Sequence, residues 1–365
     1  MGFLRPDWAQ LHQETSLRPW SPILAFFSLL YGMGVKLRSS GYQRKLFREK
    51  SLPGFVLSIG NLTAGGTGKT PAVAMLAKWA RSEGYRVAIL SRGYGGESPS
   101  GVLEVSDDKT IKANPQETGD EAYLLARKLP GIPVVISRKR LSAGLFALEN
   151  FGTNFFLLDD GFQHLALKRD LNLVLIDASI PFGNGRLLPW GPLREPVGRL
   201  VRAHGIVLTR FVGRSENYRT LSFLSAQFPS IPVYKADHLP VKLVFPQLNE
   251  VREPGFLAGK RVLGFAGIAG PDALKETLIK LGANVVWFKG YRDHYPFKRD
   301  EIQALIHMKD NLNAEYLITS EKDWVRMIPF CPTCSDLAYL AIEFELISNQ
   351  AAFYGMIRRA ANRKI

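Results

Sequence analysis

Residues 54–71 read GFVLSIGNLTAGGTGKTP, and this stretch decides the fold. It begins with a short apolar run at 54–59, continues through a glycine-rich turn and leads into a helical pattern at 71–80. A glycine-rich turn between a strand and a helix is the setting that a phosphate-binding loop requires. The glycines let successive N–H groups point at phosphate oxygens, and the helix N-terminus adds partial positive charge.

The loop offers the groups that bind a nucleoside triphosphate. Lys69 would reach the outer phosphates, and the hydroxyl of Thr70 would ligate Mg²⁺. The strict pattern has glycine where this chain has Thr63, so the loop is a variant. A plain glycine-rich turn is the alternative, but Lys69 and Thr70 after three glycines argue against it. The predicted ATP-binding residues are Thr63, Ala64, Gly65, Gly66, Thr67, Gly68, Lys69 and Thr70.

The segments that follow the loop predict a doubly wound α/β domain. Several short runs are apolar throughout, as expected for strands of a parallel sheet that is covered on both faces. These runs are 86–90, 133–136, 155–158, 171–176 and 205–208. Helical patterns at 120–128 and 140–149 fall between them, and this alternation indicates a mostly parallel sheet with a phosphate loop.

The same alternation resumes after residue 240 and predicts a second, smaller α/β domain. An irregular strand or hairpin is expected at 241–255. Further strands are expected at 261–265, 284–288, 316–319 and 337–345, and helices at 272–281, 299–310 and 349–359. The predicted division is a membrane-associating segment (1–50), the P-loop domain (51–240), the smaller domain (241–347) and a closing helix (348–365).

The composition is that of a globular chain with excess positive charge. Its 365 residues include 47 Lys and Arg against 33 Asp and Glu, a formal net charge of +14, and 46% are hydrophobic. These values exclude a mostly disordered chain and a multispan membrane protein. The charge favours an anionic partner, which could be nucleic acid, an acidic membrane face or a phosphorylated substrate. The two cysteines, Cys331 and Cys334, make no disulfide framework and fit a reducing compartment.

The N-terminus favours the membrane among these partners. Residues 19–35 carry no charge and leave no polar stripe, and a basic cluster follows at 36–50. The run is shorter than the ~20 apolar residues of a membrane span, and acidic residues precede it, unlike in a signal peptide. This order is typical of a helix that lies in an anionic membrane interface, with the bulk of the chain cytoplasmic. A helix buried against the main domain is the alternative.

Acidic residues follow one predicted strand and begin one predicted helix, at positions that suit the loop. The apolar run 155–158 ends in Asp159 and Asp160, and one of these would deliver a carboxylate to Mg²⁺ beside the phosphates. Asp120 starts a predicted helix, where it would either cap the helix or act as a general base on an acceptor hydroxyl.

Other motifs leave two interpretations open. The stretch 92–96 is a turn with an incidental arginine or an anion-binding loop, and the basic trio 138–140 is a solvated face or a clamp on phosphate. An aspartate and a histidine, Asp293 and His294, lie in a loop of the second unit. The two cysteines lack the four ligands of a structural zinc site, so we reject one.

The ordered set of motifs resembles the tetraacyldisaccharide 4′-kinase family, the lipid A 4′-kinases of Gram-negative bacteria. The resemblance runs from the N-terminal apolar segment to about residue 326. The matching pieces are 61–71, 91–95, 119–122, 159–164, 183–189, 191–196, 265–268, 293–294 and 319–323. Two positions depart from the family pattern: Gly270 stands where Asn is usual, and Tyr295 where a second His is common.

The resemblance implies an activity and roles for residues. ATP would donate its γ-phosphate to the 4′-hydroxyl of a tetraacylated glucosamine disaccharide 1-phosphate. Asp120 would be the base on this hydroxyl, with His294 completing it when the domains close over substrate. The expected Mg²⁺ ligands are Thr70, Asp159, Asp160 and Glu121. The residues expected on the substrate side or at the hinge are Asn61, Arg92, Tyr94, Arg138, Gln163, His164, Arg194 and Glu195.

Such an enzyme would act as a monomer at the cytoplasmic face of the inner membrane, with the lipid and the anionic membrane surface as partners and no nucleic acid. Three alternatives share some of its features. A membrane-associated partitioning ATPase has a similar loop, but its signature lysine is replaced here by Ala64. A kinase for a soluble small molecule would not need the apolar run. A nucleic-acid-binding protein would interleave aromatic residues with a basic groove motif.

Overall fold

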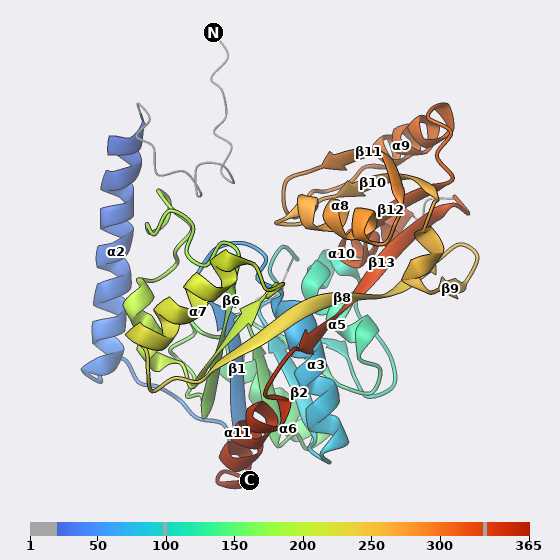
Figure 1. Ribbon diagram of the computed structural model, residues 1–365. Helices are drawn as coiled ribbons and strands as arrows, with labels where there is room; N and C mark the ends of the chain where they lie inside the picture. Colours follow the sequence, from blue (N-terminus) through green and yellow to red (C-terminus); the bar gives the residue numbers. More distant parts are fainter. Residues whose placement is uncertain (1–19, 98–100, 331–333) are drawn as a thin grey trace.

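The computed structural model describes residues 20–97, 101–330 and 334–365. Within these ranges, thirteen strands form one continuous sheet in the order β11-β10-β12-β13-β8-β7-β6-β1-β5-β2-β4-β3, with β9 paired to β8. Figure 1 shows two parts. We call β1–β7 with α3–α7 the larger part, and β9–β12 with α8–α10 the smaller part.

The larger part is the predicted doubly wound domain. Its strands are β1 (Phe55–Asn61), β2 (Val87–Ser91), β3 (Leu103–Ser106), β4 (Val134–Ile136), β5 (Phe155–Asp159), β6 (Leu171–Asp177) and β7 (Gly205–Thr209). Its helices are α3 (Lys69–Ser82), α4 (Pro115–Thr118), α5 (Asp120–Lys128), α6 (Arg140–Phe151) and α7 (Ser215–Gln227), with the 3₁₀ segment η1 (Val197–Arg202). The predicted strands are confirmed, but β3, an antiparallel edge strand, and α7 escaped prediction.

The order of the central strands places the site. β1 lies between β5 and β6 and runs parallel to both, and all three strands are buried at every residue. Their carboxyl ends therefore meet at one edge of the sheet, which is where ligands bind in open α/β sheets. This edge brings the loop after β1 next to the acidic residues that end β5 and β6.

The smaller part continues the sheet. Its elements, with the strands and the helix that connect it to the larger part, are β8 (Val233–Phe245), β9 (Glu250–Arg252), η2 (Pro254–Leu257), β10 (Arg261–Ala266), α8 (Pro271–Lys280), β11 (Asn284–Gly290), α9 (Arg299–Asn311), β12 (Tyr316–Ser320), α10 (Glu321–Met327), η3 (Ile328–Phe330), β13 (Leu337–Leu346) and α11 (Gln350–Asn362). Cys334 is buried in the core of this part, and Cys331 lies outside the described residues.

Two long strands join the parts. β8 pairs in parallel with β7 through 233–235 and then antiparallel with β13 through 236–244. Residue 240, where the sequence predicts the boundary, lies inside β8. After β13 the chain returns to the larger part, and Phe353 of α11 is buried in the same core as Phe55 of β1.

The N-terminal helix α2 (Ser21–Gln43) lies against the larger part with its small and polar side. The Ser28 hydroxyl donates to the Leu187 carbonyl at 2.9 Å, and the Tyr31 hydroxyl donates to the Arg194 carbonyl at 3.0 Å. Its large apolar side chains are exposed instead: Ile23, Phe26, Phe27, Leu29, Leu30, Met33 and Leu37. In the described part of the chain, no helix combines the length and apolar character needed to cross a membrane.

Candidate active site

The phosphate loop joins the end of β1 to the start of α3. Gly68 has φ of +81°, in the left-handed region that favours glycine, and directly precedes the helix. A Cβ added at Gly68 would lie 2.1 Å from Nε2 of His238, and one at Gly66 would lie 3.1 Å from the Cβ of Ala269. Gly68 is therefore required both for its backbone conformation and for the ring packed on it.

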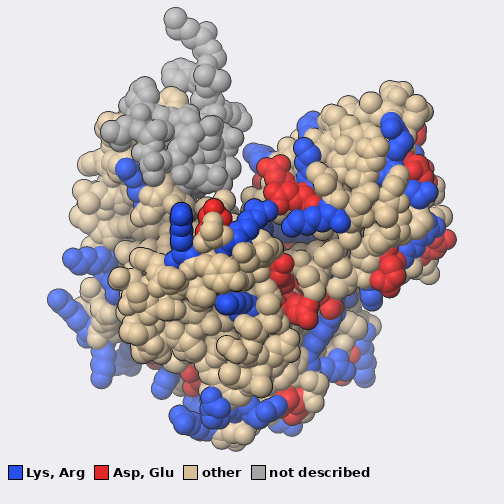
Figure 2. All heavy atoms as spheres, in the orientation of Figure 1, with Lys and Arg blue, Asp and Glu red and all other residues tan. Residues whose placement is uncertain are grey.

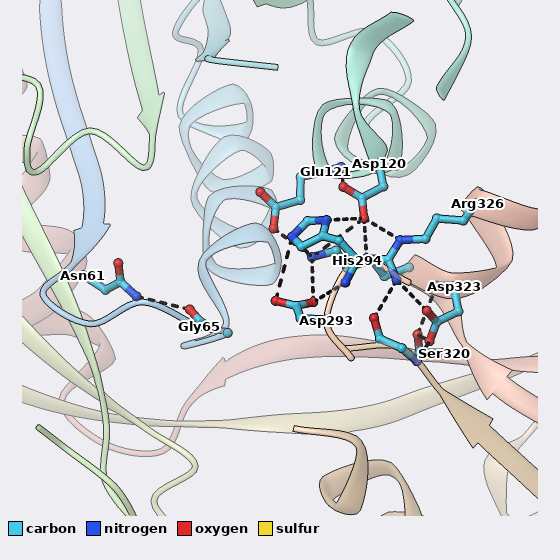
Figure 3. A network of polar contacts seen from close by, with 12 residues as sticks. Asn61, Gly65, Asp120, Glu121, Asp293, His294, Ser320, Asp323 and Arg326 are labelled. Atoms are coloured by element: carbon cyan, nitrogen blue, oxygen red, sulfur yellow. Dashed lines mark hydrogen bonds and ion pairs between the residues drawn. The ribbon is translucent and has the colours of Figure 1, made fainter. Parts of the chain in front are cut away.

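Two of the residues expected on the substrate side or at the hinge brace this loop. Nδ2 of Asn61 donates to the Gly65 carbonyl at 3.4 Å, as Figure 3 shows. Nε2 of Gln163 donates to the Asn61 carbonyl at 2.9 Å. The Ala64 N–H donates to the Pro192 carbonyl at 2.7 Å. Asn61 and Gln163 thus hold the shape of the loop.

Asp159, at the end of β5, is buried beside the loop. One carboxylate oxygen accepts a hydrogen bond from the Ser91 hydroxyl at 3.2 Å, and the other, Oδ1, has no partner among the described residues. Burial, together with the nearby carboxylates of Glu121 and Asp160, raises the pKa of Asp159 to about 7. A cation placed at Oδ1 would reverse this shift, because an opposite charge favours the ionised form.

Asp160, unlike Asp159, is paired with positively charged side chains. Nη1 of Arg194 donates to both of its carboxylate oxygens, at 2.9 and 2.7 Å, and Nζ of Lys69 lies 3.6 Å away. Burial would raise its pKa, but the charges of Lys69 and Arg194 outweigh burial and lower it. Asp160 is therefore an ionised counterion that positions the loop lysine.

A cavity of about 1230 Å³ lies between the two parts. The loop and both acids line it, and Figure 2 shows charged side chains gathered around the hollow between the parts. The loop amides and Lys69 suit a triphosphate. Oδ1 of Asp159 and the hydroxyl of Thr70, which also lines the cavity, suit Mg²⁺, which takes a few protein oxygens together with phosphates and waters.

The remaining predicted metal ligands are paired with cations. Oε1 of Glu121 contacts Lys322 and Asp160 contacts Arg194, whereas Oδ1 of Asp159 is buried without a partner among the described residues. Among the described residues no group of three His, Cys, Asp or Glu could hold a metal ion.

Asp120 and His294 meet across the boundary of the two parts. Asp120 begins α5, and His294 lies in the loop after β11 with φ of +54°. Nδ1 of His294 is 3.1 Å from Oδ2 of Asp120, and Figure 3 shows the ring turned toward the carboxylate. The sequence predicts this contact only after domain closure, whereas the structure already holds it.

Two further cations from α10 surround the Asp120 carboxylate. Nε of Arg326 donates to Oδ2 at 2.7 Å, its Nη2 contacts the same oxygen, and Nζ of Lys322 lies 3.9 Å away. Burial alone would raise the pKa of Asp120, but the hydrogen bond from His294 and the charges of Lys322 and Arg326 hold it well below its ordinary value. Asp120 is therefore a fixed anion.

The predicted substrate-side residues line the same cavity but differ in exposure. Arg92 and Arg138 are exposed, and the Tyr94 ring lies 5.7 Å from the ring of His294. His164 is half-buried. Glu195 is buried and accepts from Arg202 at 2.5 Å, so it also serves a structural ion pair.

The solvated-face interpretation of the basic trio 138–140 is wrong for Arg140. Its side chain is buried and donates to the Ser137 carbonyl at 2.9 Å and to the Asp159 carbonyl at 3.3 Å. It therefore supports the turn that follows β5. The first side chain of a helix that starts at the carboxyl edge of a sheet can point into the protein. Three consecutive charged residues in the sequence do not show this orientation.

Comparison with known proteins decides the family. The family model LpxK, described as tetraacyldisaccharide-1-P 4′-kinase, matches residues 20–362. The chain belongs to the LpxK family. The tetraacyldisaccharide 4′-kinase of Syntrophus aciditrophicus is 40% identical over 347 residues, 93% of this chain and 93% of that relative. The enzyme of the same description from Pelobacter propionicus is 41% identical over 326 residues, 89% and 88% of the two chains.

A solved structure agrees with this assignment. The crystal structure of LpxK from Aquifex aeolicus in complex with ATP aligns with a TM-score of 0.73 at 31% identity, covering 93% of this chain and 99% of that one. This LpxK family member therefore shares its overall fold with a solved LpxK structure.

Sequence reasoning gave no role to three residues of this kinase site. Lys322 and Arg326 contact Glu121 and Asp120 across 201 and 206 residues, and His238 packs on the loop from β8. The only local signal was the 319–323 motif, which contains Lys322. Contacts over such separations depend on how the two parts meet, which no local pattern encodes.

Two half-buried histidines of this kinase, His164 and His238, predict how its stability depends on pH. Burial, aided by Arg140 for His164 and by Arg210 for His238, lowers both pKa values from 6.5 to about 4. Between those pH values the unfolded chain binds protons that the folded chain does not. The free energy of unfolding should therefore fall as pH drops from 6.5 toward 4, by up to ~1.4 kcal/mol per pH unit for each histidine.

Urea unfolding of the parent, His164→Gln and His238→Gln across this window checks the prediction. Each variant should have a shallower pH slope than the parent. The exposed His307→Gln is the matched control and should keep the parent slope. Equal slopes in all four proteins would contradict the assignment of neutral rings at His164 and His238.

Proposed function

We propose that the chain transfers the γ-phosphate of ATP to the 4′-hydroxyl of a tetraacylated glucosamine disaccharide 1-phosphate, a lipid A precursor. Membership of the LpxK family and the name shared by its relatives support this activity. The observation that carries it is that Lys69 and His294, whose ring contacts Asp120, line one cavity. A phosphate donor and a base for a hydroxyl acceptor thus face each other.

On the donor side, the loop amides and Lys69 hold the phosphates while Asp160 fixes the lysine. Asp159 and Thr70 would hold Mg²⁺, with Glu121 and Asp160 as further candidates. The ion, when bound, neutralises charge on the β- and γ-phosphates. Ala269 packs on Gly66, so the smaller part covers the loop and helps exclude water from the transfer.

The contacts favour His294, rather than Asp120, as the base. Nδ1 of His294 donates to Asp120, and this bond leaves Nε2 as the acceptor nitrogen. Asp120 is held ionised by Arg326 and Lys322, so it binds a proton poorly and serves to orient the ring. The acceptor hydroxyl would give its proton to Nε2.

The acceptor side suits an anionic sugar. Arg92, Arg138 and Arg38 of α2 line the cavity, and so does His164. Arginine forks match phosphate oxygens well, so this wall would hold the 1-phosphate of the disaccharide. The Tyr94 ring beside His294 would pack on the sugar.

We propose that α2 rests in the membrane interface, so that the lipid enters the cavity from the bilayer. Its apolar side chains face outward while Ser28 faces the protein, the reverse of a helix that contributes to a core. Lys36, Arg38 and Arg44 follow the apolar residues and suit anionic headgroups. The location would be the cytoplasmic face of the inner membrane of a Gram-negative bacterium. Every residue of the proposed site comes from one chain, so a monomer suffices.

We also keep the division of the chain into 1–50, 51–240, 241–347 and 348–365 as a proposal. The smaller part has its own apolar clusters, which supports it as a unit. β8 and β13 would be the strands about which the parts move.

A transfer assay tests the function. Labelled ATP, Mg²⁺ and the tetraacyldisaccharide 1-phosphate in detergent micelles should yield a product with one added phosphate at the 4′ position. Lys69→Ala should lower the rate by ~10²-fold or more, because the lysine follows the charge of the transferring group. Hydrolysis of ATP without transfer in the parent would contradict the proposal.

The proposed Asp120–His294 pair predicts how substitutions at the two residues affect turnover. Asp120→Asn and His294→Ala should each lower kcat by ~10²–10⁴, the range of a general-base effect. The double variant should be little worse than the poorer single, because the two residues act as one unit. Asp323→Asn is the control, since Asp323 also pairs with Arg326 but has no contact with His294. Losses that multiply in the double variant would contradict the pair.

The helix α2 predicts membrane binding. Replacing Phe26, Phe27 and Leu30 together by Gln should weaken binding to anionic vesicles by at least about tenfold, because each buried apolar side chain contributes ~1.5–3 kcal/mol. The KM for the lipid should rise while ATP binding persists. Sedimentation with vesicles measures this effect.

A control for this experiment uses exposed apolar residues of the smaller part. Replacement of Leu248, Val251 and Ile279 by Gln removes comparable exposed side chains far from α2 in the sequence. Vesicle binding should persist in this triple variant. Equal losses in the two triple variants would refute a specific role of α2.

A further inference from the structure

Lys322 lines the cavity beside His294, and the proposed transfer gives it no contact with the phosphoryl group. It lies at the start of α10, directly after β12, and its side chain is 19% exposed. Its Nζ lies 2.9 Å from Oε1 of Glu121 and 3.3 Å from Nε2 of His294. Asp120 and Asp293 are each 3.9 Å away. The ammonium thus touches the nitrogen that would face the acceptor hydroxyl.

The surroundings keep this side chain charged. Burial would lower the pKa of Lys322, but Glu121, Asp120 and Asp293 together raise it. Lys69 and Lys322 both act electrostatically on the Glu121 carboxylate. Both ammonium groups line the same cavity, Lys69 in the phosphate loop and Lys322 beside His294.

If the proposed function holds, the space between Lys69 and Lys322 is where the phosphoryl group is transferred. The transferring phosphoryl group passes from ATP, near Lys69, to the hydroxyl that His294 holds. Its equatorial oxygens carry the charge of the transition state, and donors fixed around them accelerate transfer. Lys69 accounts for the donor side only.

We propose that Lys322 is a catalytic cation that binds the transferring phosphoryl group from the acceptor side, an inference that rests on the proposed function. The bond between the γ-phosphorus and the 4′-oxygen forms, and the bond to the β–γ bridging oxygen breaks. The hydroxyl proton passes to Nε2 of His294, and ADP leaves with the electron pair. Lys322 donates hydrogen bonds to the phosphoryl oxygens and exchanges no proton.

A structural role for Lys322 would be to hold two helices together, and the chain contains a matched control for that role. Lys322 of α10 pairs with Glu121 of α5, while Lys128 of α5 pairs with Glu321 of α10 at 2.6 Å. The Lys128 side chain is 13% exposed and also donates to a carbonyl, that of Ile342, at 3.0 Å. The two pairs link the same helices, but only Lys322 contacts His294.

The test compares Lys322→Met and Lys128→Met in the full chain, with Tm and kcat measured on each. Lys322→Met should lower kcat by ~10²–10³, the usual effect of removing one such donor. Its KM for ATP should stay within about threefold, and its Tm should shift no more than that of Lys128→Met. Lys128→Met should keep kcat within about threefold, and Lys322→Arg should recover at least about tenfold over Lys322→Met.

A binding measurement separates the charge effect from turnover. ADP with aluminium fluoride imitates the transferring phosphoryl group, and calorimetry with the acceptor present measures its affinity. Lys322→Met should bind ADP alone as the parent does, but should bind the fluoride complex at least about tenfold more weakly.

Two outcomes would overturn the role of Lys322: equal kcat in the two Met variants, or unchanged affinity for the fluoride complex. A parent protein that transfers no phosphate would instead overturn the proposed function itself. The two failures are therefore distinguishable.

Discussion

The buried carboxylate of Asp120 is the point on which the arrangement of the site depends. It contacts His294, Arg326 and Lys322, which all belong to the smaller part of the chain. Its own helix, α5, belongs to the larger part. Removing one partner from such a buried charge pair typically costs ~3–5 kcal/mol, because the remaining charge stays unpaired in a low dielectric. The pairing therefore fixes how the two parts meet and, with it, the position of the base.

The phosphate loop is fitted to the same contact between the parts. Gly66 and Gly68 leave room for Ala269 and His238, so side chains of the smaller part and of β8 complete the wall around the triphosphate. Arg326 also donates to the Gly267 carbonyl at 2.6 Å, in the loop that carries Ala269. Arg326 thus connects the Asp120–His294 pair to the segment that covers the phosphate loop.

Features that depend on residues close together in the sequence could be predicted. The phosphate loop, the acids after β5 and the alternation of strands and helices depend on neighbours in the chain, and the structure confirms the fold. The pairing of Asp120 with His294 was predicted from the family resemblance. Arg326, Lys322 and His238 could not be assigned roles, because their contacts join residues about 170 to 206 positions apart. The outward orientation of the apolar residues on α2 likewise depends on Ser28 meeting Leu187, which no local pattern shows.

The most direct test of this account is the protonation pattern of the His294 ring. Two-dimensional ¹⁵N NMR of the imidazoles at mildly alkaline pH distinguishes the two tautomers of a neutral histidine, and His294→Gln assigns the signal. The account predicts a proton on Nδ1 and a bare Nε2, with the pattern lost in Asp120→Asn. A proton on Nε2, or a spectrum that Asp120→Asn leaves unchanged, would contradict it.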